Sequence, residues 1–92
     1  MIRHIVFWKF RPDADPEPFL QALSALPEQI DWIRGMHVAR SAAPNAAWDA
    51  ALEVDFDTLE DVARYRDDLR HKKVSALCKS IRTDRVSIDI PL

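Results

Sequence analysis

Glycine and cysteine are almost absent from this chain, which has one residue of each among 92. A loop that cradles phosphate groups needs several glycines, because only glycine lets the backbone approach a phosphate so closely, and this class of site is therefore excluded. The single cysteine, Cys78, has no partner within the chain, so an internal disulfide is excluded as well. The lack of disulfides is typical of a reducing compartment, and we expect a cytoplasmic protein.

An excess of charge of either sign is also lacking. Thirteen basic and fifteen acidic residues give a net charge of -2, which is too balanced to indicate nucleic acid or an anionic membrane as a partner. The apolar start of the chain is interrupted by Arg3, His4 and Lys9, so we expect neither a signal peptide nor a membrane span there. The apolar fraction of 48% is ample for a folded core.

The length predicts one domain over residues 1–92. A domain this small buries only about two-thirds of the surface that its unfolded chain exposes, so a partner chain would help to stabilise it. Its apolar pattern predicts four strands and two helical segments. The strands are expected at Ile2–Phe10, Met36–Ser41, Trp48–Phe56 and Arg85–Ile90, with one helical segment from Pro16 that breaks at Pro27 and a second that starts after Thr58.

This order of elements, joined by right-handed crossovers, predicts an α+β fold of the ferredoxin-like βαββαβ type, with a four-stranded antiparallel sheet and both helices on one face. The first strand is apolar on both faces, with Val6 and Trp8 on one and Ile5 and Phe7 on the other. Helices on one side leave the second face bare. A second copy of the chain would cover it, so we predict a homodimer joined through the sheet faces.

The stretch from Phe56 to His71 carries the residues that suggest chemistry. Thr58 can cap a helix in which Leu59, Val62, Tyr65 and Leu69 recur at helical spacing and are predicted to face the sheet. Tyr65 and His71 form the one close pairing of side chains that suggests acid–base chemistry. A tyrosine can donate to a carbonyl oxygen, and a neutral imidazole can accept a proton.

Three motifs together resemble the Dabb family, the stress-responsive dimeric α/β-barrel domain. They are H-I-V-F-W-K-F at 4–10, W-D-A-A-L-E-V-D-F-D at 48–57 and Y-x-x-x-x-x-H at 65–71. The resemblance covers almost the whole chain and implies two ferredoxin-like subunits that pair into a barrel, each with its own pocket between sheet and helices. It also implies a relation to plant polyketide cyclases of the olivetolic acid cyclase type, which drive an aldol cyclisation without metal or nucleotide.

Carried to this chain, the resemblance implies Tyr65 and His71 as the catalytic pair and no cofactor. Many family members have His-Pro-x-His where this chain has Asp68 to His71, so the first histidine and the proline are missing here. The predicted wall of the pocket, which would bind a small apolar or aromatic ligand, consists of His4, Val6, Trp8, Leu52, Val54 and Val74.

Structural roles also fit these residues: Tyr65 as a core aromatic, and His4 and His71 as hydrogen-bonded core histidines. A metal site formed by His4, His71 and Asp68 lacks any close ligand spacing, so no metal is predicted. Three functions stay open. They are a cofactor-independent cyclase-like or lyase-like enzyme, a non-catalytic ligand-binding or stress-protection dimer, and a cofactor-free monooxygenase of the dimeric barrel superfamily.

Overall fold

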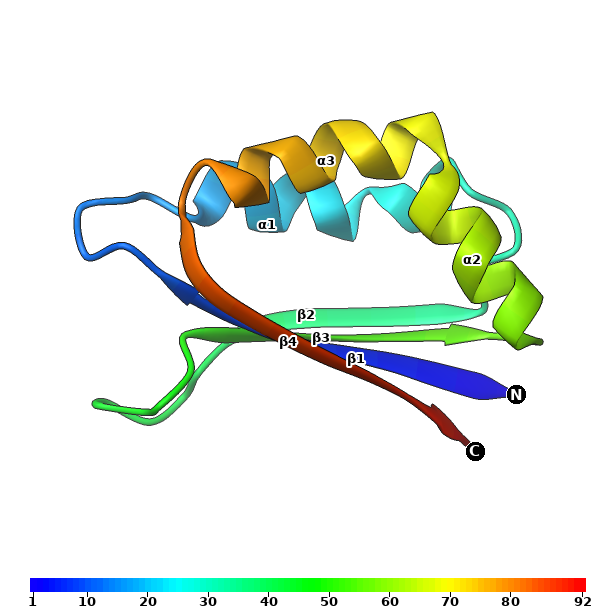
Figure 1. Cartoon of the computed structure of the whole chain (residues 1–92), viewed down its shortest axis with the longest axis horizontal. Coiled ribbons are helices and arrows are strands. Elements are labelled where there is room, and N and C mark those ends of the chain that lie inside the picture. The colour runs from blue at the N-terminus through cyan, green and yellow to red at the C-terminus, as the bar shows by residue number, and fades with distance from the viewer.

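The computed structural model describes residues 1–92 and has the predicted ferredoxin-like architecture: one four-stranded antiparallel sheet with the helices on one face (Figure 1). The strand order is β2-β3-β1-β4, so β1 lies between β3 and β4. The elements in chain order are β1 Ile2–Phe10, α1 Glu17–Ser24, the 3-10 turn η1 Leu26–Glu28, β2 Gly35–Arg40, β3 Ala50–Phe56, α2 Leu59–Asp67, α3 Leu69–Lys79 and β4 Arg82–Pro91. No helix is both long enough and apolar enough to span a membrane.

The register of β1 decides which residues of β4 share its helix-covered face. His4 lies opposite Val54 of β3 and Asp89 of β4, and Trp8 lies opposite Arg85. Because side chains alternate along a strand, the register places Arg85 and Asp89 on the face that carries His4. The alternation in the sequence separates Arg85 and Asp89 from Val86 and Ile88, but it does not say which set faces the helices.

The core fills the space between the sheet and the helices. Its 16 buried residues include no charged side chain. The strands contribute Val6, Leu52 and Phe56, and α1 contributes Phe19 and Leu23. The region around Pro27 is broken as predicted: α1 ends at Ser24 and a 3-10 turn follows, because proline cannot supply the backbone donor that a continuous helix needs.

The second helical segment bends in the middle. Thr58 caps α2 by accepting a hydrogen bond from the Asp61 amide at 3.2 Å. The helix then stops at Asp68, whose backbone is extended with φ -66° and ψ 135°. Two residues that were predicted to face the sheet are corrected: Leu59 is 59% exposed and Leu69 is 73% exposed. The bend explains the exposure of Leu69. Leu69 starts a new helix, so it does not continue the face set by the buried Tyr65.

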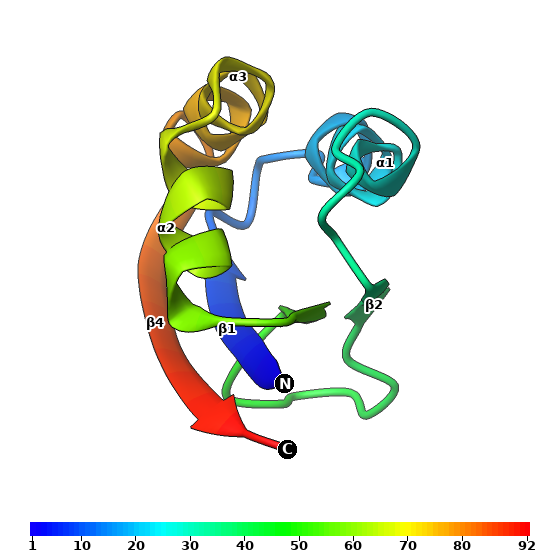
Figure 2. The same ribbon diagram turned by 90° about the vertical axis from the view of Figure 1, so that its right-hand side faces the viewer.

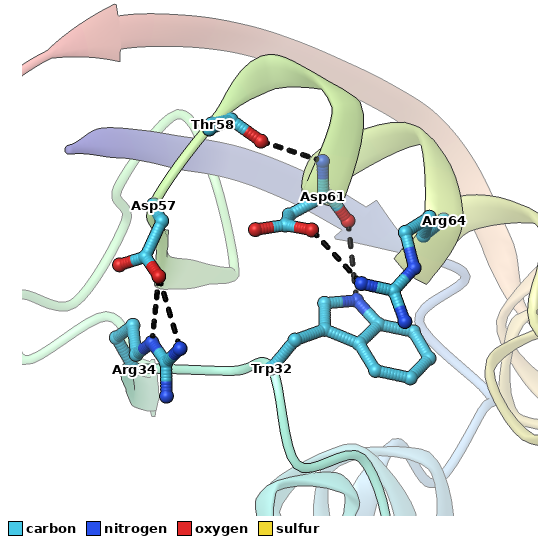
Figure 3. A network of polar contacts seen from close by, with 6 residues as sticks. All are labelled: Trp32, Arg34, Asp57, Thr58, Asp61 and Arg64. Carbon is cyan, nitrogen blue, oxygen red and sulfur yellow. Dashed lines mark hydrogen bonds and ion pairs between the residues drawn. The ribbon is translucent and has the colours of Figure 1, made fainter.

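The loop before β2 is tied to the start of α2, as Figure 3 shows. The indole of Trp32 donates to the Asp61 carbonyl at 3.2 Å, and the Arg64 guanidinium lies 4.0 Å from the centre of the same indole. Arg34 and Asp57 form an ion pair at 2.9 Å beside them. These contacts fix the position of α2, and therefore the position of the tyrosine that it carries.

The opposite face of the sheet is covered by no helix (Figure 2). It exposes large apolar side chains: Phe7 is 40%, Val86 is 46% and Ile88 is 59% exposed. Among its charged side chains, Arg3 of β1 pairs with Asp55 of β3 at 2.8 Å. This is the two-faced sheet that the first strand predicted.

Candidate functional site

A cavity of about 230 Å³ lies between the sheet and the helices α1, α2 and α3. Five of the six predicted wall residues line it, namely His4, Val6, Trp8, Leu52 and Val74. The prediction for Val54 is corrected: that side chain is 0% exposed within the core and does not reach the cavity. A smaller hollow of about 120 Å³ shares His4, Tyr65 and His71 with this cavity and extends to Asp89.

Tyr65 and His71 come together at the bend between α2 and α3. Their ring centres are 4.2 Å apart, and both side chains line the cavity. Tyr65 is 1% exposed, and its hydroxyl is the one buried side-chain polar atom without a hydrogen-bond partner. Burial raises the pKa of the Tyr65 phenol, so the phenol stays protonated at neutral pH and keeps a hydrogen bond to donate. A buried donor left unpaired costs free energy, so a hydrogen bond from Tyr65 to a ligand in the cavity would be favourable.

The imidazole of His71 is held by a backbone group. Its Nδ1 lies 3.2 Å from the Arg66 carbonyl oxygen, and a carbonyl only accepts, so Nδ1 carries the proton. The lone pair of Nε2 is then free in the neutral ring. Burial lowers the pKa of His71, and the nearby charges of His4 and Arg85 lower it further, against the effect of the Arg66 carbonyl. The neutral form is therefore favoured at neutral pH.

His4 is oriented by a carboxylate that the sequence analysis did not assign to the site. Its Nδ1 lies 2.6 Å from Asp89 Oδ1, and its ring centre is 6.4 Å from that of Tyr65. Burial lowers the pKa of His4 by more than Asp89 raises it. The β1–β4 register is the signal that locates Asp89, because it lies directly across from His4.

Asp68, which replaces the family histidine, has a different partner. Its carboxylate accepts from the Arg70 backbone at 2.8 Å and from the Arg70 guanidinium at 2.9 Å, and this pairing lowers the pKa of Asp68 to about 2. Asp68 thus caps α3, while the ring of His71 is held by Arg66. No three histidine, cysteine, aspartate or glutamate side chains come together as metal ligands.

The combination of groups is suited to proton transfer. A phenol donor and a neutral imidazole lie side by side in a cavity whose wall is partly apolar, where water competes weakly for their hydrogen bonds. Cys78 also lines the cavity, but burial raises its pKa and keeps it a thiol, so it is a poor nucleophile. Sequence reasoning missed the cations at the cavity, which are Arg66, Lys79, Arg82 and Arg85.

Fold and cavity together define a class: a ferredoxin-like α+β domain with a pocket between its sheet and its helices. The model of the stress responsive A/B barrel domain family, Dabb, matches residues 2–92, and the chain belongs to this family. The resemblance drawn from the three sequence motifs is therefore confirmed.

Solved structures share this fold. A dimeric protein of unknown function from Bacteroides fragilis NCTC 9343 is 30% identical, with a TM-score of 0.89 over 99% of this chain and 95% of that chain. A dimeric ferredoxin-like protein of unknown function from Thermobifida fusca YX is 25% identical, with a TM-score of 0.87 over 99% and 90%. The hydroxynitrile lyase of Passiflora edulis shares the fold at 13% identity, with a TM-score of 0.87 over 99% and 92%. The curated protein sequences contain no match to the chain.

Proposed function

We propose that this protein is a homodimer in which each subunit binds a small apolar or aromatic compound and catalyses cofactor-independent proton transfer beside a carbonyl group, as in polyketide cyclisation. One observation carries the proposal: the buried Tyr65 hydroxyl has no partner, and the ring of Tyr65 lies beside the neutral imidazole of His71 at a cavity. Perturbed pKa values of both groups at a concave site are typical of functional residues.

In this proposal His71 is the general base. Its Nε2 takes a proton from the carbon next to the substrate carbonyl, and the electron pair of that C–H bond becomes an enolate. The Tyr65 hydroxyl donates a hydrogen bond to the enolate oxygen, and the enolate carbon then attacks a second carbonyl of the same molecule. His71 returns the proton to the new alkoxide, so no net proton is consumed. Each of the two roles contributes about a hundredfold in rate.

The dimer rests on the uncovered sheet face. Phe7, Val86 and Ile88 expose apolar surface side by side, because β1 and β4 are neighbours. The relatives from Bacteroides fragilis and Thermobifida fusca are described as dimeric. Light scattering on the purified protein is expected to give twice the chain mass of 10.6 kDa. A folded monomer at micromolar concentration would contradict the dimer.

A non-catalytic ligand-binding role is the second candidate. The observation that favours it is again the unpartnered Tyr65 hydroxyl, because a donor of this kind can hold a ligand without any reaction. A ligand that binds to the wild-type protein and is recovered unchanged would support this role over the enzyme.

The deciding experiment is a screen of β-polyketide thioesters and aromatic carbonyl compounds for binding and for turnover. The wild-type protein is compared with Tyr65→Phe, His71→Ala and the control Lys73→Ala, whose side chain is exposed on α3 and does not line the cavity. We expect turnover to fall by about a hundredfold in each of the first two variants and to stay unchanged in the control. Equal binding and turnover in all four proteins would show that the site is assigned wrongly.

A further inference from the structure

The charges around the cavity are all of one sign. Its lining includes four cations, Arg66, Lys79, Arg82 and Arg85, and no carboxylate. The nearest acidic group of the site, Asp89, lies in the adjoining hollow and is engaged by His4. The four cations come from α2, α3 and β4, and Figure 2 shows α3 above β4 and α2 in front of it.

These four cations have no acidic partner, although acids are plentiful in the chain. The sequence has fifteen acidic and thirteen basic residues, and other arginines are paired, for example Arg3 with Asp55 at 2.8 Å and Arg40 with Glu17 at 2.7 Å. None of the ion pairs involves a cation at the cavity. Lysines away from the cavity, such as Lys72 and Lys73, are unpaired as well, but every arginine away from it has an acidic partner. The unpaired arginines are therefore a local property of the cavity.

Arg82 is half-buried and the other three cations are exposed, and holding like charges beside one another is unfavourable. Burial lowers the pKa of Arg85, and the neighbouring charges of Arg82 and Arg66 lower it further. Arg85 and Arg66 also act on His4, whose pKa their charges lower. The positive potential thus extends to the imidazoles of the site, and an anion bound there would relieve the repulsion.

The rest of the wall is apolar. Val6, Trp8 and Leu52 form its floor on the sheet, and Phe19 and Leu23 of α1 face them. An apolar wall beside a cluster of cations matches a ligand with an apolar body and an anionic head. The cavity, at about 230 Å³, is smaller than the roughly 300–1,000 Å³ of sites for drug-sized ligands.

We propose that the ligand of this cavity is a small organic acid, with an apolar or aromatic body against Trp8 and Leu52 and a carboxylate held by Arg66, Arg82 and Arg85. The inference rests on the pocket of the proposed function and adds the chemical class of its ligand. Guanidinium groups suit this role because their planar donors match a carboxylate in pairs.

Calorimetric titration with benzoate and with benzamide tests the head group, because the two compounds share one body and differ in charge. We expect benzoate to bind at least about tenfold more tightly than benzamide, and added salt to weaken only benzoate. Inorganic phosphate, which has a charge but no apolar body, is expected to bind more weakly than benzoate.

Variants test whether the arginines at the cavity cause the preference for benzoate. Arg85→Gln and the double variant Arg82→Gln/Arg85→Gln are expected to weaken benzoate binding by about tenfold or more and to leave benzamide binding unchanged. Lys73→Gln is the matched control, since Lys73 is an exposed cation on α3 that does not line the cavity. Circular dichroism confirms that each variant is folded.

Equal binding of benzoate and benzamide would overturn the acid assignment while leaving the proposed function in place, because that function depends on Tyr65 and His71. Phosphate binding as tight as that of benzoate would also overturn it, since it would show attraction of any anion to surface charge. Preference for benzoate together with loss in the Arg85 variants, but with turnover unaffected by Tyr65→Phe and His71→Ala, would support the acid-binding pocket and reject only the proposed chemistry.

Discussion

The two faces of the sheet are built from alternate residues of the same strands, yet their apolar side chains differ in how far they are buried. On the helix-covered face of β1, Val6 and Trp8 are 1% and 4% exposed, whereas Phe7 between them is 40% exposed. Since one chain has helices for only one face, apolar residues on the other gain burial only from a second molecule. The comparison shows that a single strand can serve a core within the chain and a proposed interface between chains.

The charges of the two faces differ in the same way. On the uncovered face Arg3 is paired with Asp55 at 2.8 Å, and the Lys9 ammonium lies 4.9 Å from the ring centre of Trp48. On the helix-covered face Arg85 has no acidic partner. A paired charge costs less to bury against another protein than an unpaired one, although removing it from water is still unfavourable, while unpaired cations attract an anion. The uncovered face is thus suited to a protein partner, and the cavity to a small ligand.

The largest expected effect comes from placing a charge on the uncovered face. Phe7→Asp puts an unpaired carboxylate into the proposed interface, and burying such a charge is more costly than the contact can offset. We expect the dimer to dissociate or the chain to unfold at micromolar concentration. Light scattering and circular dichroism measure the two outcomes separately.

Leu59→Asp is the matched control for Phe7→Asp. Leu59 is 59% exposed at the start of α2 and lies on neither face of the sheet. We expect this variant to keep the dimer mass and the fold. A Phe7→Asp protein that also keeps the dimer mass would place the interface elsewhere.

The next largest effect comes from the helix-covered face. Phe56 is 0% exposed, and its ring centre lies 5.1 Å from that of Tyr65. Phe56→Ala leaves a cavity in the core and is expected to lower the free energy of unfolding by about 3 to 5 kcal/mol in urea denaturation. The folded variant is expected to keep the dimer mass in light scattering.

Ile88→Ala, on the uncovered face, sharpens the comparison. Ile88 is 59% exposed in the single chain, so its truncation is expected to weaken the dimer on dilution and to change the folding of each subunit little. If Ile88→Ala lowered the free energy of unfolding as much as a core truncation does, and Phe56→Ala did not lower it, the two faces would be assigned the wrong way round.

The architecture could be predicted from the sequence because the spacing of apolar residues shows which face of each helix or strand is buried. The alternation in β1 and β3 located the core face, and Pro27 marked the end of α1. The misplaced residues were Leu59 and Leu69, which are exposed. For Leu69 the reason is that one helical stripe was extended across the bend at Asp68, where the backbone becomes extended. Helical spacing carries no information beyond the residue at which a helix stops.

The site was less accessible to sequence reasoning. The structure brings Tyr65 and His71 together near one helix bend, with ring centres 4.2 Å apart, and their catalytic role stays a prediction. Asp89 and Arg85 were missed because they reach the site through the register between β1 and β4, which joins residues from opposite ends of the chain. Contacts of this kind depend on which strands are neighbours, and no local pattern contains that information.

A smaller effect, of opposite sign to the others, is expected at Tyr65. Its hydroxyl is buried without a partner, so Tyr65→Phe removes an unpaired polar group and is expected to raise the free energy of unfolding by about 1 kcal/mol in urea denaturation. In the proposed function the same change lowers turnover, so stability and activity move in opposite directions. A loss of stability in Tyr65→Phe would show that the hydroxyl has a partner in solution.

The smallest expected effect is a pH dependence from the helix-covered face. Burial lowers the pKa values of His4 and His71 below the ordinary 6.5. Just below that pH the unfolded chain binds protons that the folded chain does not, so unfolding takes up protons and acid favours it. The stability contributed by these groups is complete above 6.5 and is lost as the pH falls through the lowered pKa values of the folded state.

Urea denaturation just above that pH and about one unit below it measures the loss, while most carboxylates remain ionised. His71→Gln is expected to reduce the pH dependence. Lys73→Gln, which is exposed on α3 and outside the cavity, is the control and is expected to leave it unchanged. Because His4 and His71 are only partly buried, solvent screens their charges and the effect stays below that of the core truncation. Stability that rises as the pH falls through this range would mean that the imidazoles are held as cations, which would leave His71 without the lone pair that a general base requires.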